Sequence, residues 1–198
     1  MPAQLFNYVL GLADDALVLG HRLSEWCGHA PLLEEELALA NIALDLIGQA
    51  RALYDYAGAI EGKGRDQDAL AYLRDAPQYR NLLLVEQPNG DFAMTIARQF
   101  FYAAHAVPFW HLMTGSRDAT LAAIAGTARH EAEYHRRHAG EWLVRLGDGT
   151  AALAAATLAR PADCWMQSGG RHGRHSEHLG YILAELQFLQ RAYPGAKW

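Results

Sequence analysis

Cysteine and lysine are both scarce in this 198-residue chain, and each scarcity excludes a class of protein. The two cysteines, Cys27 and Cys164, lie far apart, form no CxxC motif and have no His-Asp pattern nearby, which excludes a disulfide framework and a catalytic thiol. Lysine occurs only at Lys63 and Lys197 and the formal net charge is −5, so no basic stripe is available for a phosphate backbone. We predict a protein of a reducing compartment that binds no nucleic acid.

Long hydrophobic runs and nucleotide-binding motifs are missing as well. Residues 37–47 form a long apolar stretch, but Asn41 and Asp45 interrupt it, so it is too short and too polar to span a membrane. The first ten residues, MPAQLFNYVL, lack the basic region of a signal peptide. No nucleophile-elbow, dinucleotide-binding or P-loop motif occurs. We therefore expect a cytoplasmic protein without a membrane span.

Helical periodicity dominates what remains, and the alternating pattern of strands is nearly absent. Apolar residues make up 51% and charged residues 20%, as in an ordinary soluble globular protein. Asp91 and Ser176 stand where N-caps are expected. Gly58 marks the expected end of the second long helix. The predicted helices cover residues 3–26, 31–58, 69–74, 92–114, 118–146 and 176–194.

The connection between the second and third long helices is too long for a simple hairpin. Antiparallel bundles with one long crossover connection are ferritin-like. We therefore predict an all-α fold, a single ferritin-like antiparallel helical bundle over residues 1–198 with short extra helices.

Each long helix carries a polar stripe, and these stripes are the candidate functional residues. On the second helix Asn41, Asp45 and Gln49 follow one another at every fourth position and share a face. That helix is apolar on almost every side, so we expect it to be buried, with Asp45 facing inward and paired to Arg22, Arg98 or a metal. The other stripes are either solvated faces or parts of one polar centre: Asp14, His21 and Glu25; Thr95, Arg98, Tyr102 and His105; Thr127, Glu131, His135 and His138.

A ferritin-like di-iron centre takes one carboxylate from each of two helices and a Glu-x-x-His pair from each of the other two. The fourth helix offers AEYH at 132–135, where alanine replaces the glutamate, and the second offers LIGQ at 46–49, where both positions fail. Without these carboxylates the charge of two iron ions would be uncompensated. We therefore predict no metal centre, cofactor or catalytic residue in this chain. The degenerate positions are Leu46, Gln49, Ala132 and His135.

One alternative stays open, a ferritin-like metalloprotein with an unusual site of its own. Glu131 and His135 are one helical turn apart and could hold a single ion weakly. The segment HEAEYH superficially resembles the HExxH zinc motif, but Tyr134 fills the position of the second histidine. The His-rich segment 171–178 is a weaker candidate, because its glycine favours a loop at a helix start and carboxylate partners are few.

Five long stretches resemble one known family, the structural C subunits of multicomponent phenylacetyl-CoA epoxidases, also called ring 1,2-monooxygenases. Together they cover most of the chain and are far more specific than any short motif. The stretches are LSEWCGHAP (23–31), LALANIALDLIGQAR (37–51), NLLLVEQPNGDFAMTIARQF (81–100), EAEYHRRHAGEWLVRLGDGT (131–150) and SEHLGYILAELQFLQRAYPG (176–195).

The resemblance implies a ferritin-like fold and a non-catalytic role in aerobic phenylacetate degradation. It implies a catalytic A subunit that holds the di-iron centre, a small B subunit and an NADPH-dependent reductase as partners. By rough alignment of the helices, the remaining carboxylate positions fall near Ala16 and Ala103. Members of the family are longer between residues 150 and 165, and this chain departs from them there.

In place of a metal, we expect hydrogen bonds and an ion pair between the second and fourth helices. The residues of this predicted buried polar cluster are Asp45, Gln49, Glu131 and His135. A stand-alone helical binding protein is the third possibility, and co-purification with a catalytic partner distinguishes it from a subunit.

Overall fold

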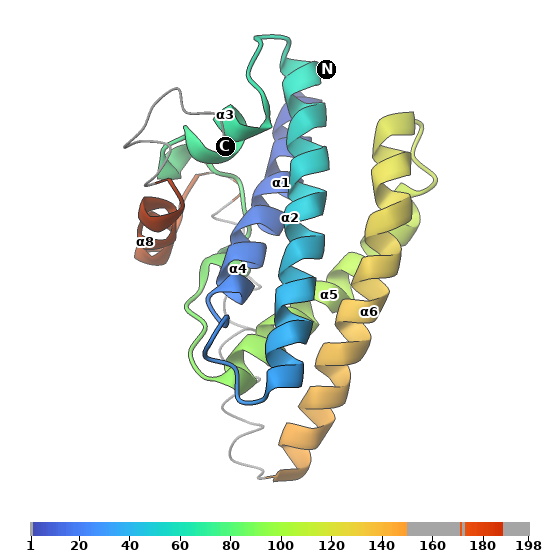
Figure 1. Ribbon diagram of the computed structural model, residues 1–198. Coiled ribbons are helices and arrows are strands. Elements are labelled where there is room, and N and C mark those ends of the chain that lie inside the picture. Colours follow the sequence, from blue (N-terminus) through green and yellow to red (C-terminus); the bar gives the residue numbers. More distant parts are fainter. Residues whose placement is uncertain (1, 150–170, 172, 188–198) are drawn as a thin grey trace.

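The computed structural model describes residues 2–149, 171 and 173–187, and these residues form helices connected by loops, with no strand among them. The predicted all-α, ferritin-like bundle is therefore confirmed (Figure 1). Cys164, the short segment 150–165 and the predicted end of the last helix at residue 194 lie outside the described residues. The elements are α1 (Pro2–Ser24), α2 (Leu33–Glu61), α3 (Gln67–Tyr72), η1 (Ala76–Gln78), α4 (Leu83–Glu86), α5 (Phe92–Met113), α6 (Ala119–Gly149) and α8 (Glu177–Leu186).

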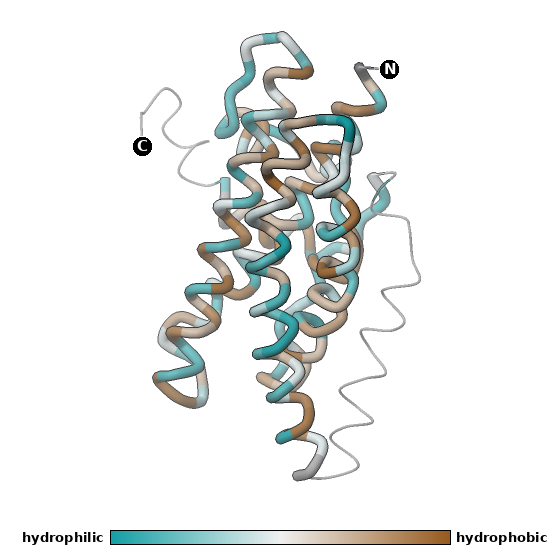
Figure 2. Tube along the Cα trace, turned by 90° about the vertical axis from the view of Figure 1, so that its right-hand side faces the viewer, coloured by the Kyte–Doolittle hydropathy of each residue, from teal (hydrophilic) through white to brown (hydrophobic). Residues whose placement is uncertain are grey.

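Two helical hairpins build the bundle. Helix α1 packs along α2, α5 packs along α6, and the hairpins meet through α2 and α6 (Figure 1). The crossover between them, residues 62–91, contains α3, η1 and α4, and α4 contacts both α1 and α5. Brown and teal segments alternate along the helices in Figure 2, as expected for amphipathic helices around a shared core.

Local chemistry explains where α5 begins and where α2 ends. Asp91 caps α5 as predicted, since its side chain accepts the Met94 N–H at 2.8 Å. Helix α2 does not end at Gly58 but continues to Glu61, where Gly62 adopts the left-handed conformation with φ 66°. Gly58 serves packing instead, because a Cβ there would lie 2.5 Å from the Arg65 carbonyl oxygen.

The predicted cap at Ser176 is wrong in its chemistry. The Ser176 hydroxyl is buried without a hydrogen-bond partner. The carboxylate of Glu86 accepts the Ser176 backbone N–H at 2.6 Å instead, and it also bonds Asn81 Nδ2 and His175 Nδ1, each at 2.9 Å. One buried carboxylate on α4 therefore fixes the start of α8, an arrangement that the local sequence around residue 176 does not reveal.

The expectation that α2 is buried all round is also wrong. Leu33, Leu37 and Leu44 are exposed, although Leu37 and Leu44 stand in the apolar stretch 37–47. Helix α2 contacts α1 on one side and α6 on another, and these leucines lie on a third side that neither helix covers. The stripe Leu33, Leu37, Asn41, Leu44 and Gly48 is exposed over four turns and carries no charge. We call these five residues the α2 apolar stripe.

A buried ion pair ties α1 to the crossover. The Asp14 carboxylate accepts hydrogen bonds from the Tyr54 hydroxyl at 2.6 Å, the Arg80 backbone N–H at 2.7 Å and the Arg74 guanidinium. The Arg74 guanidinium also lies over the ring of Tyr79, 4.1 Å from its centroid. Asp14 and Arg74 are almost fully buried, so this network is a structural anchor rather than part of a polar centre.

His21, on the same helix, is mostly buried and makes the fold sensitive to acid. Its Nε2 has no hydrogen-bond partner, and burial lowers its pKa from 6.5 to about 4. Between these two values the unfolded chain binds more protons than the folded chain, so the free energy of unfolding falls as the pH drops.

We expect His21→Leu to remove this dependence. In urea unfolding at pH 7 and at pH 4.5, the stability of the variant relative to wild type should rise by roughly 2 kcal/mol at the lower pH. Equal stability differences at both pH values would contradict the assignment.

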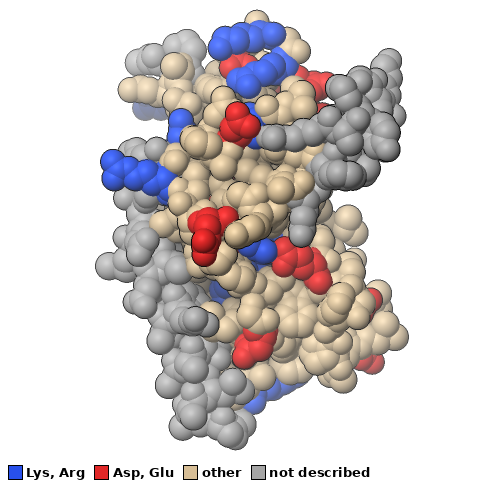
Figure 3. Space-filling view, turned by 90° about the vertical axis from the view of Figure 1, so that its left-hand side faces the viewer, with Lys and Arg blue, Asp and Glu red and all other residues tan. Residues whose placement is uncertain are grey.

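Among the described residues, no helix has the length and hydropathy needed to cross a membrane. The face seen in Figure 3 is mostly uncharged, and its basic and acidic side chains are scattered rather than gathered into a continuous basic stripe.

Candidate functional site

The polar stripes of α2 and α6 face each other and form three pairs along the two helices. Gln49 Nε2 donates to Glu131 Oε2 at 2.6 Å, and His135 Nε2 lies 3.0 Å from Asp45 Oδ2. One further pair follows toward the start of α2, where His138 Nε2 lies 2.9 Å from Glu35 Oε2. We call these six residues the polar ladder; the structure thus brings together all four residues of the predicted cluster.

The ladder is buried unevenly. His135 is 2% exposed, but the side chain of its partner Asp45 is 35% exposed, so the expected inward burial of Asp45 is wrong. Glu131 is half-buried, and burial raises its pKa. The Gln49 hydrogen bond and the charge of His135 lower that pKa, while Asp45 raises it. The ladder is therefore a partly solvated seam between two helices.

Neither arginine proposed as a partner of Asp45 reaches it. Arg22 bonds Glu25 Oε1 and the Glu86 carbonyl oxygen, each at 2.8 Å. Arg98 donates to the Gln87 carbonyl oxygen at 2.7 Å and to Asn89 Oδ1. Both arginines therefore hold the turn before α5, and His135 takes the place expected of an arginine beside Asp45.

The Glu35–His138 pair was not predicted. Glu35 stands in the first turn of α2. The helix dipole alone favours a carboxylate at that position, so the sequence offered no reason to look for a partner on another helix. The signal that could have found it is the spacing, because Glu35, Asp45 and Gln49 lie on the side of α2 that faces α6. The spacing could not identify His138 as the partner without knowing how α2 and α6 are aligned along each other.

The four stripes do not converge on one polar centre. Thr95, Arg98 and Tyr102 on α5 are buried, so they do not form a solvated face, yet they lie away from the ladder. Trp26 Nε1 donates to the Thr95 hydroxyl at 3.0 Å, and Glu25 accepts from Asn89 at 2.8 Å. The stripes diverge because the positions between them are occupied by apolar side chains.

Four of those apolar side chains stand at the positions that the sequence analysis assigned to the carboxylates of a di-iron bundle. Ala16, Leu46, Ala103 and Ala132 are all buried, one on each long helix. Methyl and isobutyl groups offer no donor atom to a metal, and His135 and Gln49 are already bonded within the ladder. The residues present therefore do not fit a di-iron centre.

A single metal ion held by Glu131 and His135 would need further ligands. Within the described part of the chain, no three His, Cys, Asp or Glu side chains are grouped so that they could hold a metal ion. His175, in the His-rich segment, is bonded to Glu86 and to the Tyr79 carbonyl oxygen, while His172 lies outside the described residues.

The fold defines the chain as a ferritin-like bundle, and apolar residues are buried at four of the positions that the sequence analysis assigned to di-iron ligands. The family model "Phenylacetic acid catabolic protein" matches residues 2–154 and 151–198, and the chain belongs to this family. It is 43% identical to the C subunit of the 1,2-phenylacetyl-CoA epoxidase of Escherichia coli (strain K12), over 98% of this chain and 99% of that protein.

The alignment to this relative spans 247 positions and is therefore longer than the 198-residue chain. The relative thus carries residues that this chain lacks. The two matches to the family model meet at residues 151–154, at the edge of the segment 150–165 that we expect to be short.

Proposed function

We propose that this chain is the non-catalytic C subunit of a phenylacetyl-CoA epoxidase. It pairs with the catalytic A subunit, which holds the di-iron centre, and a small B subunit and an NADPH-dependent reductase complete the complex. The observation that carries the proposal is the full-length similarity to a protein of that name, combined with apolar residues at Leu46 and Ala132.

The α2 apolar stripe supports assembly with another protein chain. Exposed leucines in a row are unusual on a monomer surface and mark protein–protein contacts. The stripe lies on the same helix as one half of the polar ladder. An interface at the stripe would therefore cover both an apolar surface and the partly solvated polar side chains of the ladder. Long-lived interfaces combine an apolar core with such polar groups at the rim.

Co-purification tests the proposal. A tagged chain, isolated from cells of its source grown on phenylacetate, should retain the catalytic subunit in a fixed ratio through size-exclusion chromatography. Recovery of the tagged chain alone, with the catalytic subunit eluting separately, would contradict the proposal and favour a stand-alone protein.

The ladder gives a second test, because the proposal assigns it no chemistry. We expect His135→Ala to leave turnover of the assembled complex within about twofold of wild type, since no reacting group is lost. The change should lower the stability of this chain by about 1–3 kcal/mol, because Asp45 loses its hydrogen-bond partner and a buried side chain is removed. Collapse of turnover in an intact, stable complex would instead favour the alternative metal site at Glu131 and His135.

A further inference from the structure

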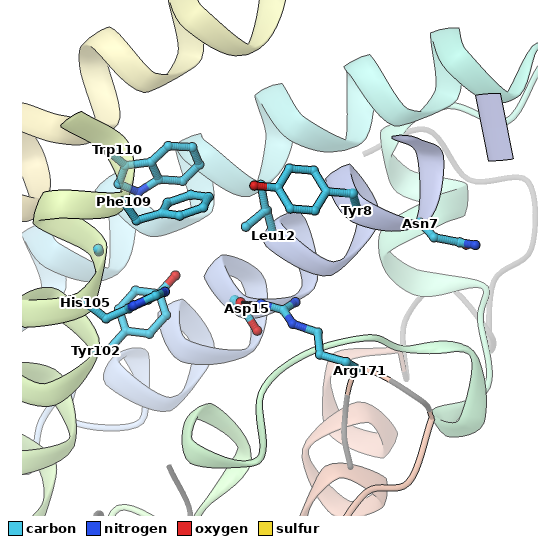
Figure 4. A pocket seen from close by; sticks show the side chains of 10 residues that line it. Asn7, Tyr8, Leu12, Asp15, Tyr102, His105, Phe109, Trp110 and Arg171 are labelled. Carbon is cyan, nitrogen blue, oxygen red and sulfur yellow. Dashed lines mark hydrogen bonds and ion pairs between the residues drawn. The ribbon is translucent and has the colours of Figure 1, made fainter. Parts of the chain in front are cut away.

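A pocket of about 140 Å³ opens between α1 and α5, with Arg171 at one end (Figure 4). Aromatic rings form much of its wall: Tyr8 comes from α1, and Phe109 and Trp110 come from the end of α5. The Phe109 and Trp110 rings pack edge to face, with centroids 4.8 Å apart. Leu12 adds an aliphatic surface between them. The wall is therefore suited to an aromatic or aliphatic body.

The other end of the pocket is polar, and most of its groups are already paired. Arg171 Nη2 lies 2.5 Å from Asp15 Oδ2, and Asp15 also accepts the Leu82 N–H at 2.7 Å. Arg171 Nη1 donates to the Arg80 carbonyl oxygen at 2.9 Å. The charge of Arg171 is therefore balanced inside the protein, and an anion entering the pocket would meet Asp15 beside it.

Tyr102 is the exception at this polar end. Its ring is almost fully buried, its hydroxyl points toward the pocket in Figure 4, and it makes no hydrogen bond to another described residue. Burial raises the pKa of Tyr102 well above its usual value, so the hydroxyl stays a neutral donor. The hydroxyl is not among the described buried polar atoms that lack a partner, so it is open to the pocket, where an atom of a ligand could bond it.

The volume of the pocket further limits which ligands it can hold. A protein cavity of roughly 150 Å³ holds one benzene ring. The present pocket has room for one ring with a small substituent, and not for a coenzyme or a nucleotide. Aromatic walls favour an aromatic body through edge-to-face contacts. The balanced ion pair disfavours a charged substituent, since a second carboxylate would lie next to Asp15.

We propose that this pocket binds a single-ring, uncharged aromatic molecule with one hydroxyl group, of the size of phenol. Its ring lies against Tyr8, Phe109 and Trp110, and its hydroxyl accepts from Tyr102 and donates to Asp15. The proposal goes beyond the role in the epoxidase complex and does not rest on it, because neither the ladder nor the α2 apolar stripe lines the pocket.

The test uses the full chain and three probes of similar size: phenol, toluene, which lacks the hydroxyl, and benzoate, which carries a charge. Titration followed by ligand-observed NMR should give one phenol site per chain. Toluene should bind about 3–10-fold more weakly, as expected for one lost hydrogen bond. Benzoate should show no saturable binding over the same concentrations.

Tyr102→Phe removes only the hydroxyl and should weaken phenol binding by about 3–10-fold while leaving toluene binding unchanged. Tyr181→Phe, on the exposed surface of α8, is the matched control and should change neither. In the wild-type chain, nuclear Overhauser effects from the phenol ring to Trp110 locate the ligand without any substitution.

Any one of the following results would overturn the proposal: no saturable phenol binding, phenol contacts that exclude Trp110, or phenol affinity that is the same in wild type and Tyr102→Phe. Benzoate binding as tightly as phenol would also overturn it, because the pocket would then select an anion. These readouts are independent of assembly, so their failure leaves the proposed function untouched.

Discussion

Replacing Leu37 and Leu44 together with glutamate should abolish assembly with the catalytic subunit while leaving this chain folded. The two side chains are 58% and 66% exposed, so their loss removes little packing inside the chain. In an apolar interface, each new carboxylate would be desolvated without a partner, at an effective penalty of several kcal/mol. Because about 1.4 kcal/mol is tenfold in affinity, the double variant should lose several orders of magnitude in binding.

Exposed leucines elsewhere on the chain provide the matched control. Leu73, after α3, and Leu112, near the end of α5, are exposed but do not belong to the α2 apolar stripe. Their double replacement with glutamate adds the same charge and should leave assembly intact. Assembly would be followed by size-exclusion chromatography with light scattering, and turnover should follow assembly. If the Leu37 and Leu44 variant still binds at wild-type affinity, the stripe is not the interface.

The largest loss of stability is expected from Asp14→Asn. Its carboxylate bonds Tyr54, Arg74 and the Arg80 N–H, and the amide would leave the buried guanidinium of Arg74 without a counter-charge. Removing one partner of a buried ion pair destabilises a protein by roughly 3–5 kcal/mol. The denaturant midpoint should therefore fall sharply, with the crossover between α2 and α5 exchanging its amide hydrogens earlier than the bundle.

Asp55→Asn makes the same chemical change on an exposed part of α2 and is the control. Surface changes of this kind usually alter stability by less than about 0.5 kcal/mol. Equal midpoints for the two variants would show that the Asp14 network is not the anchor of the crossover.

Much of the fold could be predicted because the helices are long and their boundaries carry chemical signals. Asp91 caps α5 through its own side chain, so the neighbouring residues contain the whole explanation. Gly58 led to a wrong helix end because a glycine in a helix can either end the helix or let another segment pack closely against it. Only the position of Arg65 distinguishes the two roles. Glu86 could not be linked to the start of α8, since the two are far apart in the chain.

The candidate site was predictable in part for the same reason. Asp45, Gln49, Glu131 and His135 follow from helical spacing, and the structure places them in contact. The depth of Asp45 did not follow, because burial depends on how many neighbours a helix has and not on its own composition. The pocket beside Asp15 combines residues from three distant segments, and no spacing rule relates them.

Reconstitution of the reaction tests the central claim most directly. Phenylacetyl-CoA, NADPH, the reductase and the B subunit would be mixed with this chain, with the catalytic subunit, or with both, and the epoxide product would be measured. We predict product at a substantial rate only when both chains are present. Product formed by this chain without the catalytic subunit would contradict the account, as would an equal rate from the catalytic subunit alone.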